Sequence, residues 1–145
     1  MTEHFSLDEL TASQEATRHG INNKPSEKVL ENLRMLATLL EQVRELLGGN
    51  SIRISSGYRS LMLNRHIGSN DTSAHVRGYA ADFTCPSFGS PIEVATKIAE
   101  SNLKFDQLIC EGNAWIHISC DPQNRRQVLT ARFEHGHTYY TTGIA

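Results

Sequence analysis

The sequence predicts an α+β fold in which one domain packs helices on one face of a mainly antiparallel sheet. Helical periodicity dominates the first half of the chain and strand-like alternation the second, without the regular βαβ order of a parallel sheet. A chain of 145 residues, 39% of them hydrophobic, is long enough to form one hydrophobic core and too short to form two cores of stable size. We therefore expect a single domain over residues 1–145.

Four segments carry the signals of helices. The clearest is a stripe of apolar residues that recur at steps of three and four from Val29 to Leu47 and stop before a pair of glycines. A short helix is expected at 6–12, inside an N-terminal extension over residues 1–25, because a serine there precedes two acidic residues. The other two are expected at 61–68 and 91–101.

Alternating patterns predict the strands. IRIS at 52–55 and YAADF at 79–83 have the period of half-buried strands. The segments FDQLICE and WIHISC flank Gly112-Asn113-Ala114 and should form a hairpin. The prediction leaves residues 17–26 as a connecting loop and residues 128–145 as a C-terminal tail along the surface.

Composition argues against several classes of protein. The net charge is −2 and charges of both signs are interspersed, so the sequence has no basic patch of the kind that binds nucleic acid. No cluster of lysines indicates binding to a membrane surface. Residues 1–10 lack the basic start and apolar stretch of a secretory signal, so we expect synthesis in the cytoplasm. The three cysteines form no C-x-x-C pair, which argues against a disulfide framework and a thiolate zinc site.

The stretch SAHVRGYAAD, residues 73–82, places a carboxylate on a predicted strand. Asp82 should lie on a sheet face, where an unpaired charge is costly. His75, just before the strand, suggests that the two side chains share a metal ion. Pairing with an arginine, either Arg53 or Arg59, would also neutralise the carboxylate.

The hairpin supplies a third candidate ligand. In WIHIS, His117 lies on the strand face opposite Ile116 and Ile118, which leaves it free to reach a ligand. A single histidine is more often structural than a ligand, but two imidazoles and one carboxylate are a common ligand set for catalytic zinc. His75, Asp82 and His117 would together hold one Zn²⁺ per chain.

Zinc hydrolysis also needs a base that takes a proton from water without occupying the metal. Glu111 is the candidate, although by default a glutamate at a hairpin end is a solvated edge charge. A three-residue loop pairs Glu111 with Trp115 and puts both on the face of His117, whereas a two-residue loop pairs it with Ala114 and turns it away. The mechanism therefore predicts the three-residue loop.

Three motifs in this order resemble the zinc D-alanyl-D-alanine carboxypeptidase family of murein peptidases, which is related to the hedgehog zinc domain. They are S-G-Y-R-S at 56–60, S-x-H-x-x-G-x-A-x-D at 73–82 and W-I-H-I-S at 115–119, with LNR at 63–65 and FDQLI at 105–109 as further likeness. The opening FSLDELTAS and the short single-domain layout are similar to bacteriophage endolysins. The resemblance covers the chain from about residue 25 to about residue 120.

The resemblance implies a role for each motif residue. It makes His75, Asp82 and His117 the zinc ligands, Glu111 the general base, and Arg59 the cation that faces the substrate carbonyl or carboxylate. The implied substrate is the stem peptide of peptidoglycan, and we expect a monomer without stable membrane association. The implied activity is a D-Ala-D-Ala carboxypeptidase or an endopeptidase for the L-Ala-D-Glu bond or a cross-link, acting on the cell wall after synthesis in the host cytoplasm.

Two further residues are candidate substrate contacts. Ser73 is a possible hydrogen-bond donor to substrate or to the loop beside His75. Trp115 is either a core residue or a wall of the substrate cleft, and it stands where some relatives have a second histidine. That difference leaves the base assignment to Glu111, at a spacing similar to that of the hedgehog zinc domain.

Two alternative functions remain open at this point. Some hedgehog proteins keep the metal without clear peptidase activity, so the chain is alternatively a non-catalytic zinc module that binds wall peptides or a protein. The other alternative is a metal-free domain in which an arginine neutralises Asp82. His135 and His137 are expected to be surface residues, and His4, His19 and His66 have no supporting pattern in the sequence.

Overall fold

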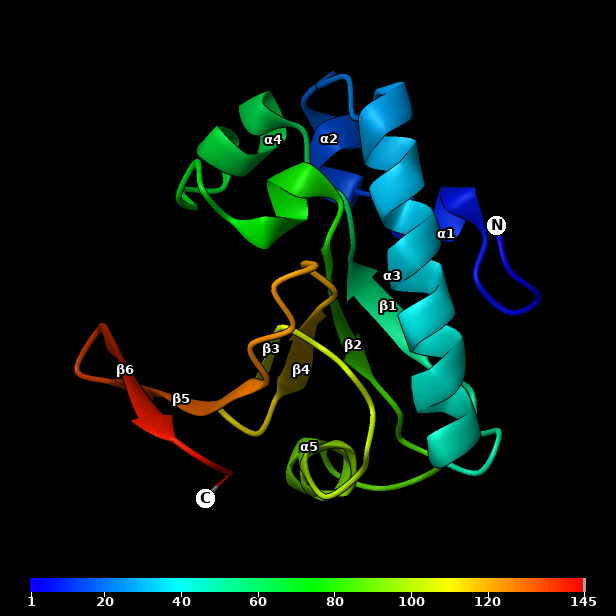
Figure 1. The fold of residues 1–145 in the computed structure, drawn as a ribbon. Coiled ribbons are helices and arrows are strands. Elements are labelled where there is room, and N and C mark those ends of the chain that lie inside the picture. The colour runs from blue at the N-terminus through cyan, green and yellow to red at the C-terminus, as the bar shows by residue number, and fades with distance from the viewer. Residues whose placement is uncertain (145) are drawn as a thin grey trace.

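The computed structural model, shown in Figure 1, describes residues 1–144 as a sheet with helices against it. The helical elements of these residues are α1 (Leu7–Thr11), α2 (Gln14–Arg18), α3 (Glu27–Leu46), α4 (Leu61–His66), the 3₁₀ helix η1 (Ala74–Arg77) and α5 (Pro91–Ala99). The strands are β1 (Arg53–Ser56), β2 (Ala80–Thr84), β3 (Gln107–Glu111), β4 (Trp115–Ser119), β5 (Gln127–Glu134) and β6 (His137–Thr142).

The strands form one sheet in the order β1-β2-β4-β3-β5-β6. Every neighbouring pair is antiparallel except β3 and β5, which run parallel. The α+β class and the mainly antiparallel sheet predicted from sequence are therefore confirmed.

One face of the sheet and the long helix α3 form the core. Alternate residues of the central strands are buried on this face, among them Phe83, Leu108, Ile116 and Ile118. They pack with the apolar stripe of α3 and the inner face of α5 in one hydrophobic cluster. Figure 1 shows α3 running along the sheet and α5 lying across one end of it. Because strand side chains alternate, the opposite face carries the polar residues.

Serine side chains fix where the helices begin. Ser26 accepts a hydrogen bond from the backbone N–H of Val29 at the start of α3. Ser90 and Glu93 form a reciprocal capping box at the start of α5, where Pro91 occupies the first turn. These caps account for the agreement between the predicted and observed starts of the two helices.

Two segments differ from the sequence predictions. The expected loop at 17–26 begins inside a second short helix, α2, which Ser13 caps through the N–H of Ala16. The expected tail from residue 128 instead forms β5 and β6, a hairpin that extends the sheet at one edge. Its weak periodicity has a physical reason: all of β6 is exposed, so burial imposes no alternation on its residues. No helix in residues 1–144 has the length and apolar character needed to cross a bilayer.

Candidate metal centre

His75 is held in η1, immediately before β2. Ser73 caps this 3₁₀ helix by accepting the N–H of His75, 3.3 Å away. The buried ring then places Nδ1 2.8 Å from the carbonyl oxygen of Gly57. A carbonyl can only accept, so Nδ1 carries the proton and donates it, and Nε2 is left with its lone pair. This hydrogen bond fixes the tautomer that a metal requires.

Asp82 and His117 face each other across two paired strands. They are direct partners in the antiparallel register of β2 and β4, on the face opposite the core. Since partners in a ladder have side chains only about 5 Å apart, the register alone brings the two groups together. His117 Nδ1 lies 3.0 Å from Asp82 Oδ1.

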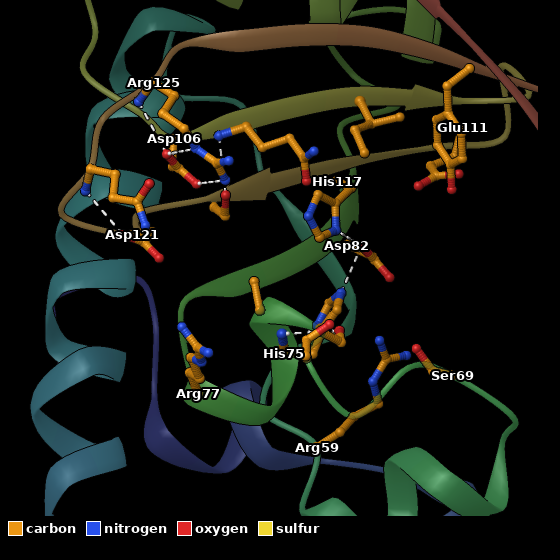
Figure 2. Close-up of a pocket in the computed structure, with 18 of the residues that line it drawn as sticks. Arg59, Ser69, His75, Arg77, Asp82, Asp106, Glu111, His117, Asp121 and Arg125 are labelled. Atoms are coloured by element: carbon orange, nitrogen blue, oxygen red, sulfur yellow. Dashed lines mark hydrogen bonds and ion pairs between the residues drawn. The ribbon is translucent and has the colours of Figure 1, made fainter.

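The three candidate ligands converge on one point, as Figure 2 shows, with Asp82 between the two imidazoles. His75 Nε2 lies 3.2 Å from the same Asp82 oxygen, and one donor atom of each residue lies within 4.8 Å of the other two. Neighbouring ligand atoms around a tetrahedral zinc ion with bonds of about 2.0–2.1 Å are about 3.4 Å apart. The donor set and its spacing therefore fit zinc.

Burial and charge act in opposite directions on these groups. Burial alone would raise the pKa of Asp82, but the two imidazoles outweigh it and hold that pKa well below its usual range. Burial lowers the pKa of His75, against the pull of Asp82 in the other direction. The carboxylate stays ionised, and the buried imidazole of His75 favours the neutral form that binds metals.

Glu111 ends β3 on the same face as His117. The loop between β3 and β4 has three residues, and Glu111 pairs with Trp115, as the mechanism required. The side chain lines a cavity of about 510 Å³ that also contains the three candidate ligands. Burial raises the pKa of Glu111, the charge of His117 opposes this rise, and the negative charge of Asp82 adds to it to a lesser degree. A carboxylate that holds a proton more readily than usual is suited to act as a base.

Arg59 reaches the cavity from the loop that follows β1. Figure 2 shows its side chain entering beside His75, and its backbone N–H donates to the His75 carbonyl, 3.1 Å away. Its Nε is buried without a hydrogen-bond partner among the described residues. Burial lowers the pKa of this guanidinium, and the charge of Asp82 opposes that shift. A buried donor without a partner is costly, so this group is available for an anionic or carbonyl oxygen of a ligand.

The arginine alternative for Asp82 finds no support in the geometry. In residues 1–144, the ion-pair partners of the Asp82 carboxylate are His75 and His117, and neither Arg53 nor Arg59 lies within ion-pair distance. Arg53 is exposed at the start of β1. Among the described residues, neither arginine therefore neutralises Asp82 through a direct ion pair, although the charge of Arg59 acts on the site from a greater distance.

The model of the Peptidase M15 family matches residues 3–119 of the chain. The chain belongs to the Peptidase M15 family. The match includes every residue predicted for the site and confirms the resemblance to zinc murein peptidases of the D-Ala-D-Ala carboxypeptidase type. No curated protein matches the sequence.

Family membership gives the donor set a chemical context. Peptidases of the M15 family are zinc-dependent and act on peptidoglycan. In this M15 chain, the residues that fit zinc are His75, Asp82 and His117, all of which lie inside the matched region. The carbonyl oxygen of Gly57 orients the His75 ring by accepting a hydrogen bond from its Nδ1.

The other predicted substrate contacts of this M15 protein lie in the same cavity. Ser73 lines it, although its oxygen is already used as the cap of η1. Trp115 is half-buried in the cavity wall rather than in the core, and its ring stacks on Phe133 with centroids 6.2 Å apart.

Sequence reasoning missed residues that reach the cavity from later elements. Tyr140 on β6 lines it, and burial together with the Glu111 charge raises the pKa of its hydroxyl. Arg125 and the buried Asp106 form an ion pair at the other end, with Nη2 2.8 Å from Oδ2. Tyr140 was missed because the segment from residue 128 was expected to be a tail and not part of the sheet, so nothing placed Tyr140 beside Glu111. Asp106 lies in the quoted FDQLI stretch, but no local pattern indicated its ion pair with Arg125.

Proposed function

We propose that this protein is a zinc-dependent peptidase that hydrolyses an amide bond in the stem peptide of bacterial peptidoglycan, in the role of a phage endolysin. The bond is the terminal D-Ala-D-Ala link, the L-Ala-D-Glu link or a cross-link. The observation that carries the proposal is the meeting of His75, Asp82 and His117 in one cavity with Glu111 on the same sheet face. Membership of the M15 family supports the reaction class.

Each residue of the site has a defined task in this reaction. His75, Asp82 and His117 hold the zinc ion, which when bound polarises the scissile carbonyl and acidifies a water molecule. Glu111 accepts the proton of the attacking water and then delivers it to the leaving amine, so that no covalent intermediate with the protein is needed. Arg59 donates a hydrogen bond to the oxygen on which negative charge develops, since its buried Nε–H has no acceptor among the described residues.

The remaining cavity residues orient the substrate. Trp115 forms an apolar wall beside Glu111, and Ser73 is positioned to donate its hydroxyl proton to a substrate oxygen while it caps η1. The opposite end is charged and polar, which suits an extended peptide that carries carboxylate and amide groups. The proposed enzyme works as a monomer on the cell wall after synthesis in the host cytoplasm.

Replacement of the general base tests the proposal. Glu111→Gln keeps the shape of the side chain but removes its basicity, so kcat on purified peptidoglycan should fall by about 10²- to 10⁴-fold while bound zinc is unchanged. Glu134→Gln is the matched control, because Glu134 is exposed at the end of β5 and lies outside the cavity. Mass spectrometry of the released fragments identifies the bond.

The same experiment separates the proposed enzyme from a non-catalytic zinc module. A module would retain zinc and bind wall peptides, and neither wild type nor Glu111→Gln would release fragments. Loss of fragment release on chelation and its return with zinc would support the enzyme. Equal fragment release by wild type and Glu111→Gln would remove Glu111 from the mechanism.

A further inference from the structure

A second cluster of ligand-type side chains lies outside the cavity, at the surface formed by α2 and α4. Its members are Glu15 in α2, His19 at the end of α2 and His66, the last residue of α4. One donor atom of each lies within 4.8 Å of the other two, the same criterion that the catalytic group meets. Two of these residues are exposed and Glu15 is half-buried, so an ion can reach them from solvent.

Two imidazoles of this cluster approach one carboxylate oxygen. Nε2 of His19 lies 3.3 Å from Glu15 Oε2, and Nε2 of His66 lies 3.5 Å from the same atom. Both distances exceed the usual 2.7–3.2 Å of an N–H···O hydrogen bond and match the separation of about 3.4 Å between ligands of a tetrahedral zinc ion. The other oxygen, Oε1, faces Arg18 at 3.4 Å. The carboxylate is thus oriented with one oxygen toward both imidazoles.

Local structure explains why the three donors meet. Glu15 and His19 are four residues apart at α2, so they lie on one face of the helix. His66 comes from the neighbouring helix α4, and its ring centroid lies 4.4 Å from that of His19. Figure 1 shows α2 and α4 next to each other at one end of the molecule. Two positively charged imidazoles would repel at this distance, whereas two neutral ones can share a cation.

We propose that Glu15, His19 and His66 bind a second divalent transition-metal ion, of the Zn²⁺ class, separate from the catalytic site. Two imidazoles and one carboxylate favour zinc, nickel or copper over calcium or magnesium, which prefer oxygen ligands. Three protein ligands leave the remaining position to water. The site does not depend on the proposed peptidase activity.

The ion would join two segments that already meet around the Arg59 loop. The N–H of Tyr58 donates to the carbonyl of Leu10, 2.8 Å away. The side chain of Asn23 donates to the carbonyls of Thr11 and Tyr58 and accepts from the N–H of Ser60. These bonds attach the N-terminal segment to the loop. The metal would add a link between α2 and α4, the helix that follows the loop. The ion therefore acts as a clamp on the loop that carries Arg59.

Zinc stoichiometry and affinity test the proposal independently of activity. Full-length wild type should retain a second zinc ion per chain after dialysis against low-micromolar zinc, measured by elemental analysis. His66→Asn should bind that ion at least about tenfold more weakly, because loss of a supporting contact alone costs 10- to 100-fold. His135→Asn is the matched control, since His135 is an exposed histidine in the β5–β6 turn, and it should retain both ions.

A variant without the catalytic site keeps the two metal sites distinguishable. His75→Ala/His117→Ala should still bind one ion, with cobalt giving the visible absorption of a nitrogen-ligated tetrahedral centre. Zinc should raise the thermal midpoint of this variant, and adding His66→Asn should abolish the rise without changing the midpoint measured in chelator. If zinc content and the midpoint shift are the same with and without His66, the proposal is wrong, whatever the outcome for the peptidase.

Discussion

Gly57→Ala is the substitution whose effect the structure defines most sharply. A Cβ at Gly57 would lie 3.0 Å from the carbonyl carbon of Leu10 and 3.1 Å from its Cα, and closer still to its oxygen. All three are backbone atoms, so no side-chain rotation relieves the overlap. The loop that follows β1 and the helix α1 would have to move apart.

The expected cost follows from what this movement disrupts. Overpacking of a well-packed site costs about 1–3 kcal/mol, and the hydrogen bond from Tyr58 to Leu10 contributes about 1 kcal/mol. Gly57→Ala should therefore lower the free energy of unfolding by about 2–4 kcal/mol. Because the Gly57 carbonyl also accepts the hydrogen bond from His75 Nδ1, zinc affinity at the candidate metal centre should fall by about 10- to 100-fold.

Urea denaturation in chelator measures the first effect, and competition with a zinc indicator measures the second. The midpoint should drop at constant m value if only stability changes. Gly136→Ala is the comparison without steric overlap: Gly136 has a φ of +76° and no atom within 4 Å of an added Cβ, so its cost of about 1–2 kcal/mol is backbone strain, which Gly57→Ala does not incur because the φ of Gly57 is not in the positive range. A Gly57→Ala protein within about 0.5 kcal/mol of wild type would refute the close approach of Gly57 and Leu10.

Two further predictions concern charged groups of the cavity. Arg59→Lys replaces the planar guanidinium by a compact ammonium group, so kcat/KM should fall by about 10²-fold with zinc content unchanged. A kcat/KM equal to that of wild type in steady-state assays would count against a substrate role for Arg59. Asp106→Asn tests the buried ion pair, because hydrogen bonds from Arg125 lower the pKa of Asp106 below its ordinary 3.8. A lowered carboxyl pKa stabilises the fold above the unfolded value and loses that effect as pH falls through the folded value. The stability difference between wild type and Asp106→Asn, from urea curves, should thus be large near neutral pH and shrink in acid, and a difference independent of pH would contradict this.

The sequence predicted the residues that meet in the candidate metal centre because the face on which each strand residue lies follows from local pattern. Alternation along β2 and β4 determines the faces of Asp82 and His117, and these faces follow from burial of Phe83, Ile116 and Ile118. The loop of three residues then decides the face of Glu111. The faces of Asp82 and His117 could be inferred from neighbouring residues alone, whereas the face of Glu111 depended on a loop length that the sequence left open and the structure decided.

Other features had no such local signal. The hairpin of β5 and β6 is specified largely by pairing with the edge of β3, and its exposed residues show no apolar period. The position of Tyr140 in the cavity wall was therefore not predicted from the sequence. The pairing of His66 with His19 depends on how α2 packs beside α4, which is a contact between segments more than forty residues apart in the printed sequence.

The sequence by itself determined the fold class, the family and the identity of the candidate ligands, because hydrophobic period and residue type are local properties. Only the tertiary structure decided which groups share a point in space. The Gly57 carbonyl that orients His75, the unpartnered Nε of Arg59 and the cluster at Glu15 all arise from contacts between segments brought together by packing. Such contacts depend on the free energy of the whole fold, to which distant residues contribute as much as neighbours do.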